Sequence, residues 1–367
     1  MEKKLDLDQV REDEGKGIDY TKRKSHRRRK KKKVWKIVLT VFSVLALLVC
    51  VGFGSFVILQ KTGKNSLMKY AGTEQMSMKN TEESGLVSRN GKKYKYNENV
   101  ITLLCMGIDK DSTSWEETGY IGENGQADAI FLLALNPDAG SLDIIGISRD
   151  TMTEIATYDK QGNYVGESVN HLALAFSYGK TKEEGAELVK TAVSKLFYNL
   201  PIHGYAAIDW DALGKINDSV GGVEVTFNEE VVLNGETFAG GEKMRLTGEQ
   251  AKSFVRQRGD EIGSNNKRMQ RQKMYAAAFI GAAKNAVLEN PILVSDMYKE
   301  LSGDMVTSMG VDEVVYLASL LPSMRFSLDD IQMIEGEVKE GTVYEEFYAD
   351  EDKLMNLILD IFYYEVY

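Results

Sequence analysis

The chain contains few cysteines, which cross-link small secreted domains, and few histidines, which act in the active sites of many hydrolases. Its 367 residues include two cysteines, three histidines and four prolines. Two cysteines exclude a disulfide scaffold. Three scattered histidines are too few for a histidine metal cluster or a catalytic triad, and GxSxG, HExxH, Walker and Rossmann motifs are absent. The chain is nevertheless 43% hydrophobic, too apolar for a disordered protein.

Charge is divided unevenly along the chain. Residues 1–36 contain 15 Lys/Arg and seven Asp/Glu, a net charge of +8, whereas residues 37–367 hold 30 basic and 48 acidic side chains, a net charge of −18. At the boundary, residues 37–59 form a run of 23 residues without any charge. A helix of that length reaches about 35 Å, enough to cross a bilayer core of about 30 Å.

The positive-inside rule places the basic N-terminus in the cytoplasm and everything after the apolar run outside. We therefore predict a single-pass protein of the cell membrane. Its parts are a basic cytoplasmic tail (1–36), a transmembrane helix (37–59), a polar stalk (60–85) and an extracytoplasmic domain (86–367).

Two other interpretations of the N-terminal region are less favoured. The apolar run is longer than the roughly 7–15 residues typical of a cleaved signal peptide. A lipoprotein site at Cys50 is disfavoured because bulky Val49 precedes it and the apolar run continues beyond it. The basic tail has no interleaved aromatics and no DNA-binding motif, so no nucleic-acid partner is expected.

The extracytoplasmic part predicts one mixed α/β domain with helices on both faces of its sheet. Asn90-Gly91 lies between two short β-like runs and indicates a hairpin. The remaining predicted strands are 100–106, 129–135, 142–148, 206–210, 223–227 and 331–334. The predicted helices are 169–177, 183–198, 211–220, 248–258, 266–288 and one from about residue 352.

Acidic residues are predicted to gather at one edge of this sheet. The turn at 136–140 makes its two flanking strands antiparallel. If the strand 100–106 also runs antiparallel to its neighbour, three strand ends meet and bring together Asp109, Asp128, Arg149 and Asp150. Facing carboxylates with oxygen-only chemistry suit Mg²⁺ or Mn²⁺. The alternative is that these aspartates only cap turns and strands.

A basic segment stands out within the acidic domain. Residues 245–273 contain eight Lys/Arg and three acids, a net charge of +5. Arg268, Arg271 and Gln272 share one helix face, and Arg256 and Arg258 lie shortly before them. Arginine suits bidentate contacts with phosphate oxygens, so a cation site beside these arginines indicates phosphoryl transfer. The alternative is a solvated basic face.

Several segments resemble the LytR-CpsA-Psr proteins of bacterial cell envelopes. The resemblance covers about residues 94–288. It rests on LLCMGIDKD, ADAIFLLALNPDAGSLDIIGISRDTMTEI, VNHLALAFSYG, AAIDWDALGKINDSVGGVEVTF and GGEKMRLTGEQAKSFVRQRG followed by KRMQRQ. It implies an α/β/α three-layer sandwich with a mixed central sheet. It also implies transfer of a glycopolymer phosphate from an undecaprenyl-pyrophosphate carrier to a peptidoglycan hydroxyl, with Mg²⁺ or Mn²⁺.

The resemblance also assigns roles to the two clusters. Asp109 and Asp128 match the metal-binding acids. The arginines and their neighbours match catalytic and substrate-binding positions: Arg149, Asp150, Arg256, Arg258, Arg268, Arg271 and Gln272. The implied partners are a polyprenyl-pyrophosphate-linked glycopolymer, peptidoglycan and the membrane.

Four positions depart from the family pattern. Gln126 and Asp111 stand where arginine is frequent, Ser148-Arg149 lacks an intervening proline, and Asn265 replaces a frequent aspartate. Asparagine cannot accept a proton as a general base. A non-catalytic scaffold that binds the lipid pyrophosphate therefore remains an alternative, as does a membrane-bound transcription attenuator acting through the basic tail.

Overall fold

The computed structural model describes residues 57–69, 85–110, 121–159, 161–257, 264–341 and 344–367, without the side chains of 264–266. The chain divides into Met1–Ile58 and Leu59–Tyr367, and the second unit is described below. None of the helices described there combines the length and apolarity needed to cross a bilayer. The predicted cytoplasmic tail, and all but the last three residues of the predicted membrane helix, lie outside the described residues.

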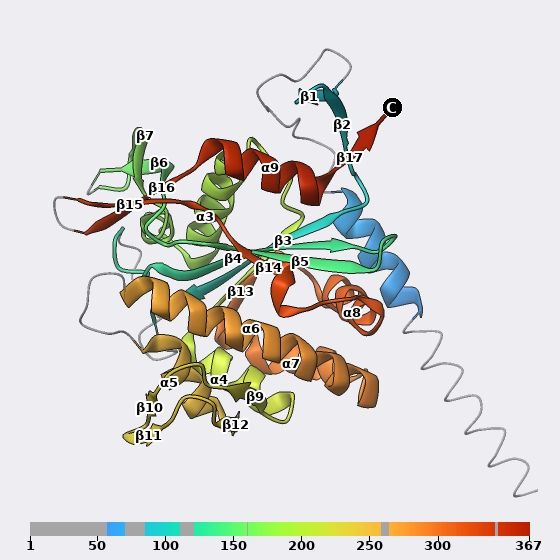
Figure 1. The fold of residues 1–367 in the computed structure, drawn as a ribbon, viewed down its shortest axis with the longest axis vertical. Coiled ribbons are helices and arrows are strands. Elements are labelled where there is room, and N and C mark those ends of the chain that lie inside the picture. The colour runs from blue at the N-terminus through green and yellow to red at the C-terminus, as the bar shows by residue number, and fades with distance from the viewer. Residues whose placement is uncertain (1–56, 70–84, 111–120, 160, 258–263, 342–343) are drawn as a thin grey trace, which may run out of the picture. The chain divides into compact units, whose positions relative to one another are not determined.

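A six-stranded mixed sheet forms the centre of the domain (Figure 1). Its order is β13 (Met305–Thr307), β8 (Gly204–Ile208), β3 (Ile101–Ile108), β4 (Ala127–Asn136), β5 (Ser141–Ile147) and β14 (Ile331–Met333). The pair β4–β5 is antiparallel, as predicted, and β3–β4 is antiparallel, the condition on which the predicted cluster depended. In contrast, β8 runs parallel to β3 and β14 runs parallel to β5.

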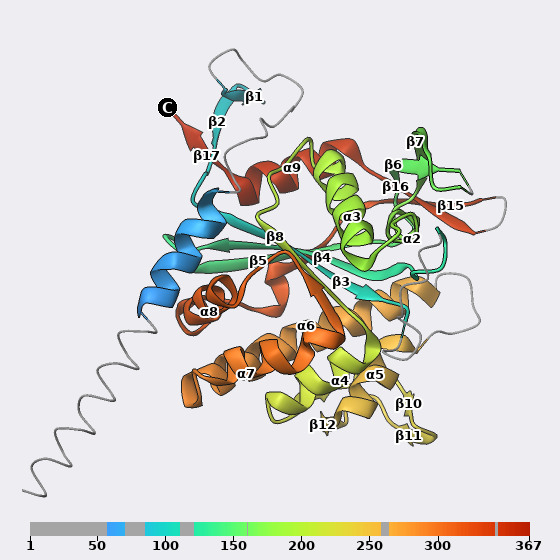
Figure 2. The ribbon, with the colours of Figure 1, turned by 180° about the vertical axis from the view of Figure 1, so that it is seen from behind.

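Helices cover both faces of this sheet (Figures 1 and 2). Leu104 and Met106 of β3 pack toward α3 (Lys182–Leu196) and α9 (Glu351–Phe362). The alternate residues Ile101 and Leu103 pack toward α6 (Ser264–Glu289) and α8 (Val311–Leu320). Because strand side chains alternate between faces, an apolar strand of this kind must be covered on both sides. The predicted mixed α/β fold with a mixed central sheet is confirmed.

Smaller elements surround the sheet. The remaining helices are α2 (Leu174–Ser177), α4 (Trp210–Ser219), α5 (Gly248–Arg256) and α7 (Leu293–Glu300). Three antiparallel hairpins accompany them: β6 (Met152–Tyr158) with β7 (Tyr164–His171), β10 (Val231–Leu233) with β11 (Glu236–Phe238), and β15 (Gly336–Glu340) with β16 (Glu345–Ala349). A further antiparallel pair, β9 (Val223–Thr226) with β12 (Lys243–Leu246), encloses β10 and β11 in the chain.

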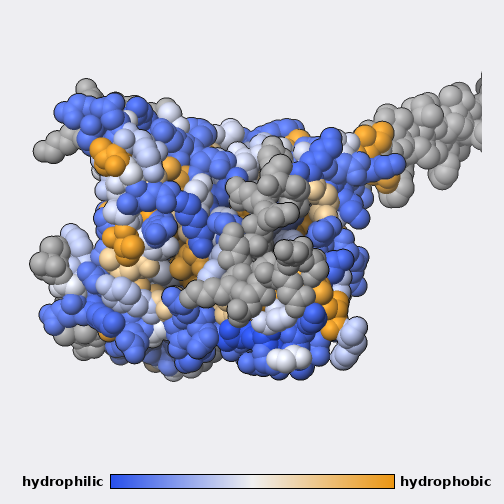
Figure 3. Space-filling view, turned by 90° about the horizontal axis from the view of Figure 1, so that it is seen from above, coloured by the Kyte–Doolittle hydropathy of each residue, from blue (hydrophilic) through white to orange (hydrophobic). Residues whose placement is uncertain are grey.

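The predicted hairpin at Asn90-Gly91 is confirmed. It joins β1 (Val87–Arg89) to β2 (Lys92–Tyr96), and β17 (Tyr363–Val366) pairs with β2. Both turn residues have positive φ, 52° and 77°, the geometry that Asn-Gly turns favour. The face of the molecule in Figure 3 is mainly hydrophilic with smaller hydrophobic patches, as expected when most apolar side chains are internal.

The helix predicted for residues 169–177 is wrong over its first part. Residues up to His171 belong to β7, and only Leu174–Ser177 form a helix. The apolar spacing of Val169, Leu172 and Phe176 imitates a helical face. The antiparallel pairing of β7 with β6 overrides that local pattern, with Ser168 opposite Ile155, thirteen residues earlier in the chain.

Part of the segment predicted as a polar stalk is also folded. Residues 57–69 are helical, and Leu67 is fully buried in the core beside Tyr316 and Leu317 of α8. A side chain at Gly63 would collide with the backbone of Asp312, so this helix approaches α8 closely. The polar composition of the segment concealed these two contact positions.

Truncating Leu67 tests whether this helix is part of the domain. We expect Leu67→Ala to lower the free energy of unfolding by about 2–4 kcal/mol, because the substitution leaves a cavity in the core. Chemical denaturation measures the loss. Asn65→Ala, at an exposed position of the same helix, is the matched control and should change stability by less than about 0.5 kcal/mol. Equal effects of the two variants would show that the helix does not pack on the domain.

Candidate active site at the edge of the central sheet

Three strand ends meet at one edge of the central sheet. Asp109 directly follows β3, Asp128 is the second residue of β4, and Arg149 and Asp150 lie just after β5. Because β4 is antiparallel to both neighbours, the end of β3, the start of β4 and the end of β5 lie side by side. The predicted convergence of these four residues is therefore what the topology produces.

A bulge at this edge determines the direction of Asp128. Gly107 pairs with Ala129, and the next residue, Ile108, pairs with Ala127, so Asp128 is the extra residue of a β-bulge. Ile130 and Leu132 face the core beneath α3, and uninterrupted alternation would point Asp128 to the same side. The bulge instead places Ala127 in that core and turns Asp128 toward the rim, by which we mean the sheet edge where the three strand ends meet.

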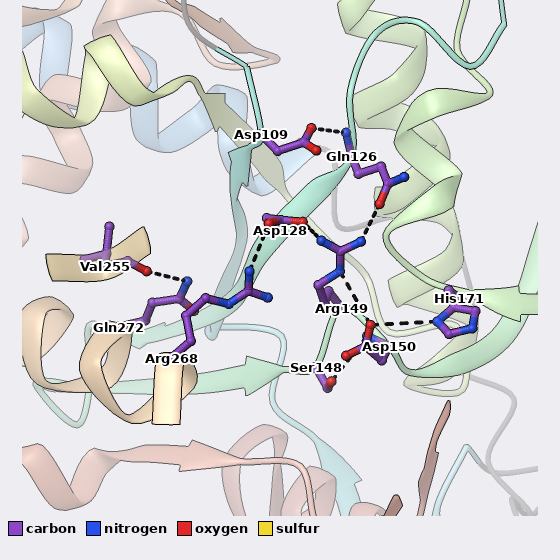
Figure 4. Close-up of polar contacts among 10 residues, drawn as sticks. All are labelled: Asp109, Gln126, Asp128, Ser148, Arg149, Asp150, His171, Val255, Arg268 and Gln272. Atoms are coloured by element: carbon purple, nitrogen blue, oxygen red, sulfur yellow. Dashed lines mark hydrogen bonds and ion pairs between the residues drawn. The ribbon is translucent and has the colours of Figure 1, made fainter. Parts of the chain in front are cut away.

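The Asp128 carboxylate lies between two guanidinium groups (Figure 4). Its Oδ1 accepts a hydrogen bond from Nη1 of Arg149, and its Oδ2 accepts one of 3.0 Å from Nη1 of Arg268. All three side chains are largely buried, with 6%, 19% and 4% of the side-chain surface exposed for Asp128, Arg149 and Arg268. Two guanidinium groups on either side of one carboxylate form a site for an anion with several oxygens.

The predicted helix face of α6 points into the protein. Arg268, Arg271 and Gln272 are all buried, as expected for positions i, i+3 and i+4. Arg271 donates from Nη1 to Oε1 of Glu229 at 2.7 Å and from Nη2 to the carbonyl of Gln257 at 2.5 Å. Of these three side chains of α6, Arg268 therefore contacts Asp128, while Arg271 holds α6 against the segments before β10 and after α5.

Gln272 and Arg256 occupy different surroundings. The Gln272 amide donates to the carbonyl of Val255 at 3.5 Å, which holds α6 against α5. Arg256 is exposed, and its guanidinium lies 4.8 Å from the centre of the Trp210 ring, a cation–π distance. The structure thus places Arg256 with Trp210 and not with Asp128. Arg258 lies outside the described residues.

Asp109 and Gln126 complete the rim. The Asp109 carboxylate accepts the backbone N–H of Gln126 at 2.6 Å, and the Gln126 side chain accepts a hydrogen bond from Nη2 of Arg149. Gln126 was noted in the sequence only as a departure from the family pattern. Its contact with Arg149 gives it a positioning role.

The two predicted metal ligands offer oxygen donors of the right kind for a hard cation. Among the described residues, no group of three His, Cys, Asp or Glu side chains could hold a metal ion by itself. Mg²⁺ is commonly held by one or two carboxylates while phosphate oxygens and waters complete its shell. Asp109 and Asp128, from neighbouring strand ends, fit that pattern. They do not fit a cage made by the protein alone.

Asp150 lies on the other side of Arg149. Its Oδ1 is 3.5 Å from Nε of Arg149 and 3.8 Å from Nδ1 of His171 (Figure 4). Burial raises the pKa of Asp150 above its ordinary value, and Glu345 raises it further, while Arg149, His171 and Arg268 act in the opposite direction. A carboxyl group with a raised pKa beside an anion site is a candidate proton acceptor.

The sequence argument missed His171. It ends β7 and pairs with Met152 at the start of β6, a register that brings it beside Asp150. In the sequence it was set aside because three histidines could not form a cluster. The missing information was the hairpin pairing, which local periodicity did not indicate.

Neutralising Asp128 tests the anion site. We expect Asp128→Asn to lower the free energy of unfolding by about 2–4 kcal/mol, because two buried guanidiniums lose their carboxylate. Inorganic pyrophosphate with a chelator should then raise the melting temperature of the variant more than that of the wild type, since the anion no longer competes with Asp128.

Asp360→Asn, at an exposed position on α9, is the control for loss of one charge. Calorimetry of the three proteins with and without pyrophosphate gives the comparison. Identical pyrophosphate shifts in wild type and Asp128→Asn would count against an anion site between Arg149 and Arg268.

Solved structures with this fold are available for comparison. Bacillus subtilis TagV aligns with a TM-score of 0.55 at 22% identity, over 71% of this chain and 94% of TagV. A structure described as TagT bound to LIIa-WTA aligns with a TM-score of 0.54 at 19% identity, over 72% of this chain and 89% of TagT. At these identities the likeness concerns the fold.

Sequence relatives extend the comparison. The Bacillus cereus polyisoprenyl-teichoic acid–peptidoglycan teichoic acid transferase TagU is 27% identical over 233 residues, 64% of this chain and 68% of TagU. TagU of Bacillus subtilis strain 168 is 23% identical over 334 residues, 91% of this chain and 97% of TagU. The LytR_cpsA_psr family model matches residues 56–357, which include every described residue of the site. The chain is therefore a member of the LytR-CpsA-Psr family.

Proposed function

We propose that this protein transfers a glycopolymer phosphate from an undecaprenyl-pyrophosphate carrier to a hydroxyl group of peptidoglycan. Family membership supports a role in cell-envelope assembly, and two relatives are named as transferases of teichoic acid to peptidoglycan. Fold and family alone do not fix a reaction, so the proposal depends on the chemistry of the site.

The observation that carries the proposal is the pair of buried arginines on one carboxylate. Arg149 comes from the loop after β5 and Arg268 from the second turn of α6, yet both reach Asp128. Two arginines from separate elements, buried at a sheet edge, suit the several oxygens of a pyrophosphate. In the free protein Asp128 acts as the anion that keeps them apart and oriented.

The reaction needs charge to be stabilised on both phosphates. We propose that Arg149 and Arg268 contact the phosphate under attack, and that Arg271, Arg256 and Arg258 stabilise the leaving phosphate. Gln272 orients a phosphate oxygen. The start of α6 adds a favourable dipole, because a helix N-terminus attracts negative charge. Polyprenyl phosphate leaves and remains in the bilayer.

A divalent cation belongs to this proposal. Mg²⁺ or Mn²⁺ held by Asp109 and Asp128 would neutralise part of the pyrophosphate charge. With Asp128 engaged in holding the cation, Arg149 and Arg268 would be available to the phosphate oxygens. The same carboxylate thus orients the arginines in the free protein and contributes to cation binding in the loaded one.

Both substrates determine where the protein works. A polyprenyl carrier lies in the membrane and peptidoglycan lies outside it, so we propose a single-pass anchor at residues 37–59 with the domain on the outer side. The charge-free length of that segment and the basic residues before it support this orientation.

Removing Arg149 tests the transferase assignment. Arg149→Ala should lower the rate of transfer to a peptidoglycan oligosaccharide about 10²–10³-fold, because an oriented charge on the transferred phosphate is lost. Mass spectrometry of the product, made by the full-length protein in detergent, measures the rate. Arg245→Ala, exposed on β12, should leave it unchanged.

Full transfer activity of Arg149→Ala would refute the catalytic assignment. Tight binding of the lipid pyrophosphate by a wild-type protein that forms no product would favour the scaffold alternative, which the asparagine at position 265 suggests.

Metal dependence gives a separate test. Chelation should abolish transfer, and Mg²⁺ or Mn²⁺ should restore it. Asp109→Asn should raise the Mn²⁺ concentration needed for half-maximal rate by at least about tenfold, with Asp360→Asn as control. Undiminished transfer in the chelator, with the cation content checked by elemental analysis, would remove the cation from the proposal.

A further inference from the structure

An acidic cavity lies next to the arginine site. Its volume is about 120 Å³, and its polar wall includes Asp150, Glu345 and Glu346. Apolar side chains, among them Met269 and Phe347, complete the lining. At about 30 Å³ per water molecule in the liquid, this volume corresponds to about four waters, which is room for one hydroxyl-bearing edge of a sugar ring.

The cavity is built by the C-terminal hairpin. The backbone N–H of Phe347 donates to the carbonyl of Asp150 at 2.9 Å, and a β-bridge joins Phe347 to Thr151. Tyr344, in the turn of the same hairpin, lies edge-on to His171 with the ring centres 6.2 Å apart. The hairpin β15–β16 is thus attached to the loop that carries Arg149 and Asp150.

Charge determines what this cavity accepts. Three carboxylates repel the phosphates and the anionic polymer that the arginines attract. In the part of the chain that the structure describes, no group of three or more His, Cys, Asp or Glu side chains could hold a metal ion, so these three carboxylates do not form such a group. Carboxylates do accept hydrogen bonds from hydroxyl groups, and apolar side chains pack against the C–H faces of a sugar ring. A neutral saccharide therefore matches the lining.

We propose that this cavity binds the acceptor sugar and that Asp150 is the general base that receives the proton of its hydroxyl group. The inference rests on the proposed function, since it concerns the second substrate of the same reaction. Asp150 links the cavity to the arginine site, because it lines the cavity and its Oδ1 lies 3.5 Å from Nε of Arg149. A hydroxyl group bound there is brought beside the phosphate site.

The transfer reaction is an in-line displacement at phosphorus. The acceptor oxygen forms a bond to the sugar-linked phosphorus, and the bond from that phosphorus to the bridging oxygen breaks. The bridging oxygen leaves with the electron pair as polyprenyl phosphate, and the acceptor proton moves to the Asp150 carboxylate.

The charged groups around Asp150 set its working range. Arg149 faces it from its own loop, His171 from β7, Arg268 from α6 and Glu345 from β16. Burial and Glu345 raise the pKa of Asp150, so its base form is lost as pH falls through a value above that of an ordinary carboxyl group. Transfer should therefore decline on the acidic side with a midpoint above roughly 4.

Three substitutions in the full-length protein test the proposal, with a peptidoglycan tetrasaccharide as acceptor and a short-chain polyprenyl-pyrophosphate sugar as donor. Asp150→Asn should lower kcat about 10²–10⁴-fold and leave the Kd of the donor within threefold. Glu345→Gln should raise the acceptor KM about tenfold and move the acidic midpoint to lower pH. His171→Asn should move that midpoint to higher pH. A purely structural role for these residues would not produce opposite shifts.

Glu337→Gln is the matched control, because Glu337 is exposed on β15 of the same hairpin and does not line the cavity. Transfer by Asp150→Asn within twofold of wild type, or an unchanged acceptor KM in Glu345→Gln, would overturn the inference. If wild type transfers, Arg149→Ala does not, and the three variants resemble wild type, this inference alone fails. If wild type itself transfers nothing, the proposed function and this inference fail together.

Discussion

The contact of Asp128 with Arg149 and Arg268 is the interaction on which the rest of the site depends. It joins three parts of the fold, since Asp128 is the second residue of β4, Arg149 follows β5 and Arg268 lies on α6. A buried carboxylate with two buried guanidiniums is tolerated only when each charge has a partner. The arrangement therefore holds two guanidinium groups in place at the sheet edge, and in the proposed function an incoming anion would take the place of the carboxylate between them.

Separation of charge divides this edge into two surfaces. In the proposed function, arginines on one side attract phosphates, and carboxylates on the other side repel phosphates and accept hydrogen bonds from hydroxyl groups. Asp150 stands at the boundary, between Arg149 and His171. The proposed reaction joins an anionic donor to a neutral acceptor, and this separation of charge keeps each substrate out of the other's binding site. The −18 net charge of residues 37–367 therefore conceals a local arrangement of opposite signs.

Much of the sheet could be predicted because its strands are long, apolar and joined by a short turn. That pattern also placed Asp128 near Arg149. The bulge that turns Asp128 to the rim could not be predicted, since it depends on pairing with β3. Neither could the position of His171, which the hairpin register sets, nor the burial of Leu67, one apolar contact in a polar segment. Arg256 shows the same limit, because its stacking on Trp210 is a contact between distant elements.

The central claim is that the two arginines around Asp128 form a pyrophosphate site completed by a divalent cation. A crystal structure with geranyl pyrophosphate and Mn²⁺ tests it most directly. The account predicts a pyrophosphate between Arg149 and Arg268, with an anomalous manganese peak within coordinating distance of Asp109 and Asp128. A pyrophosphate bound elsewhere, with Asp128 still paired to both arginines, would contradict it.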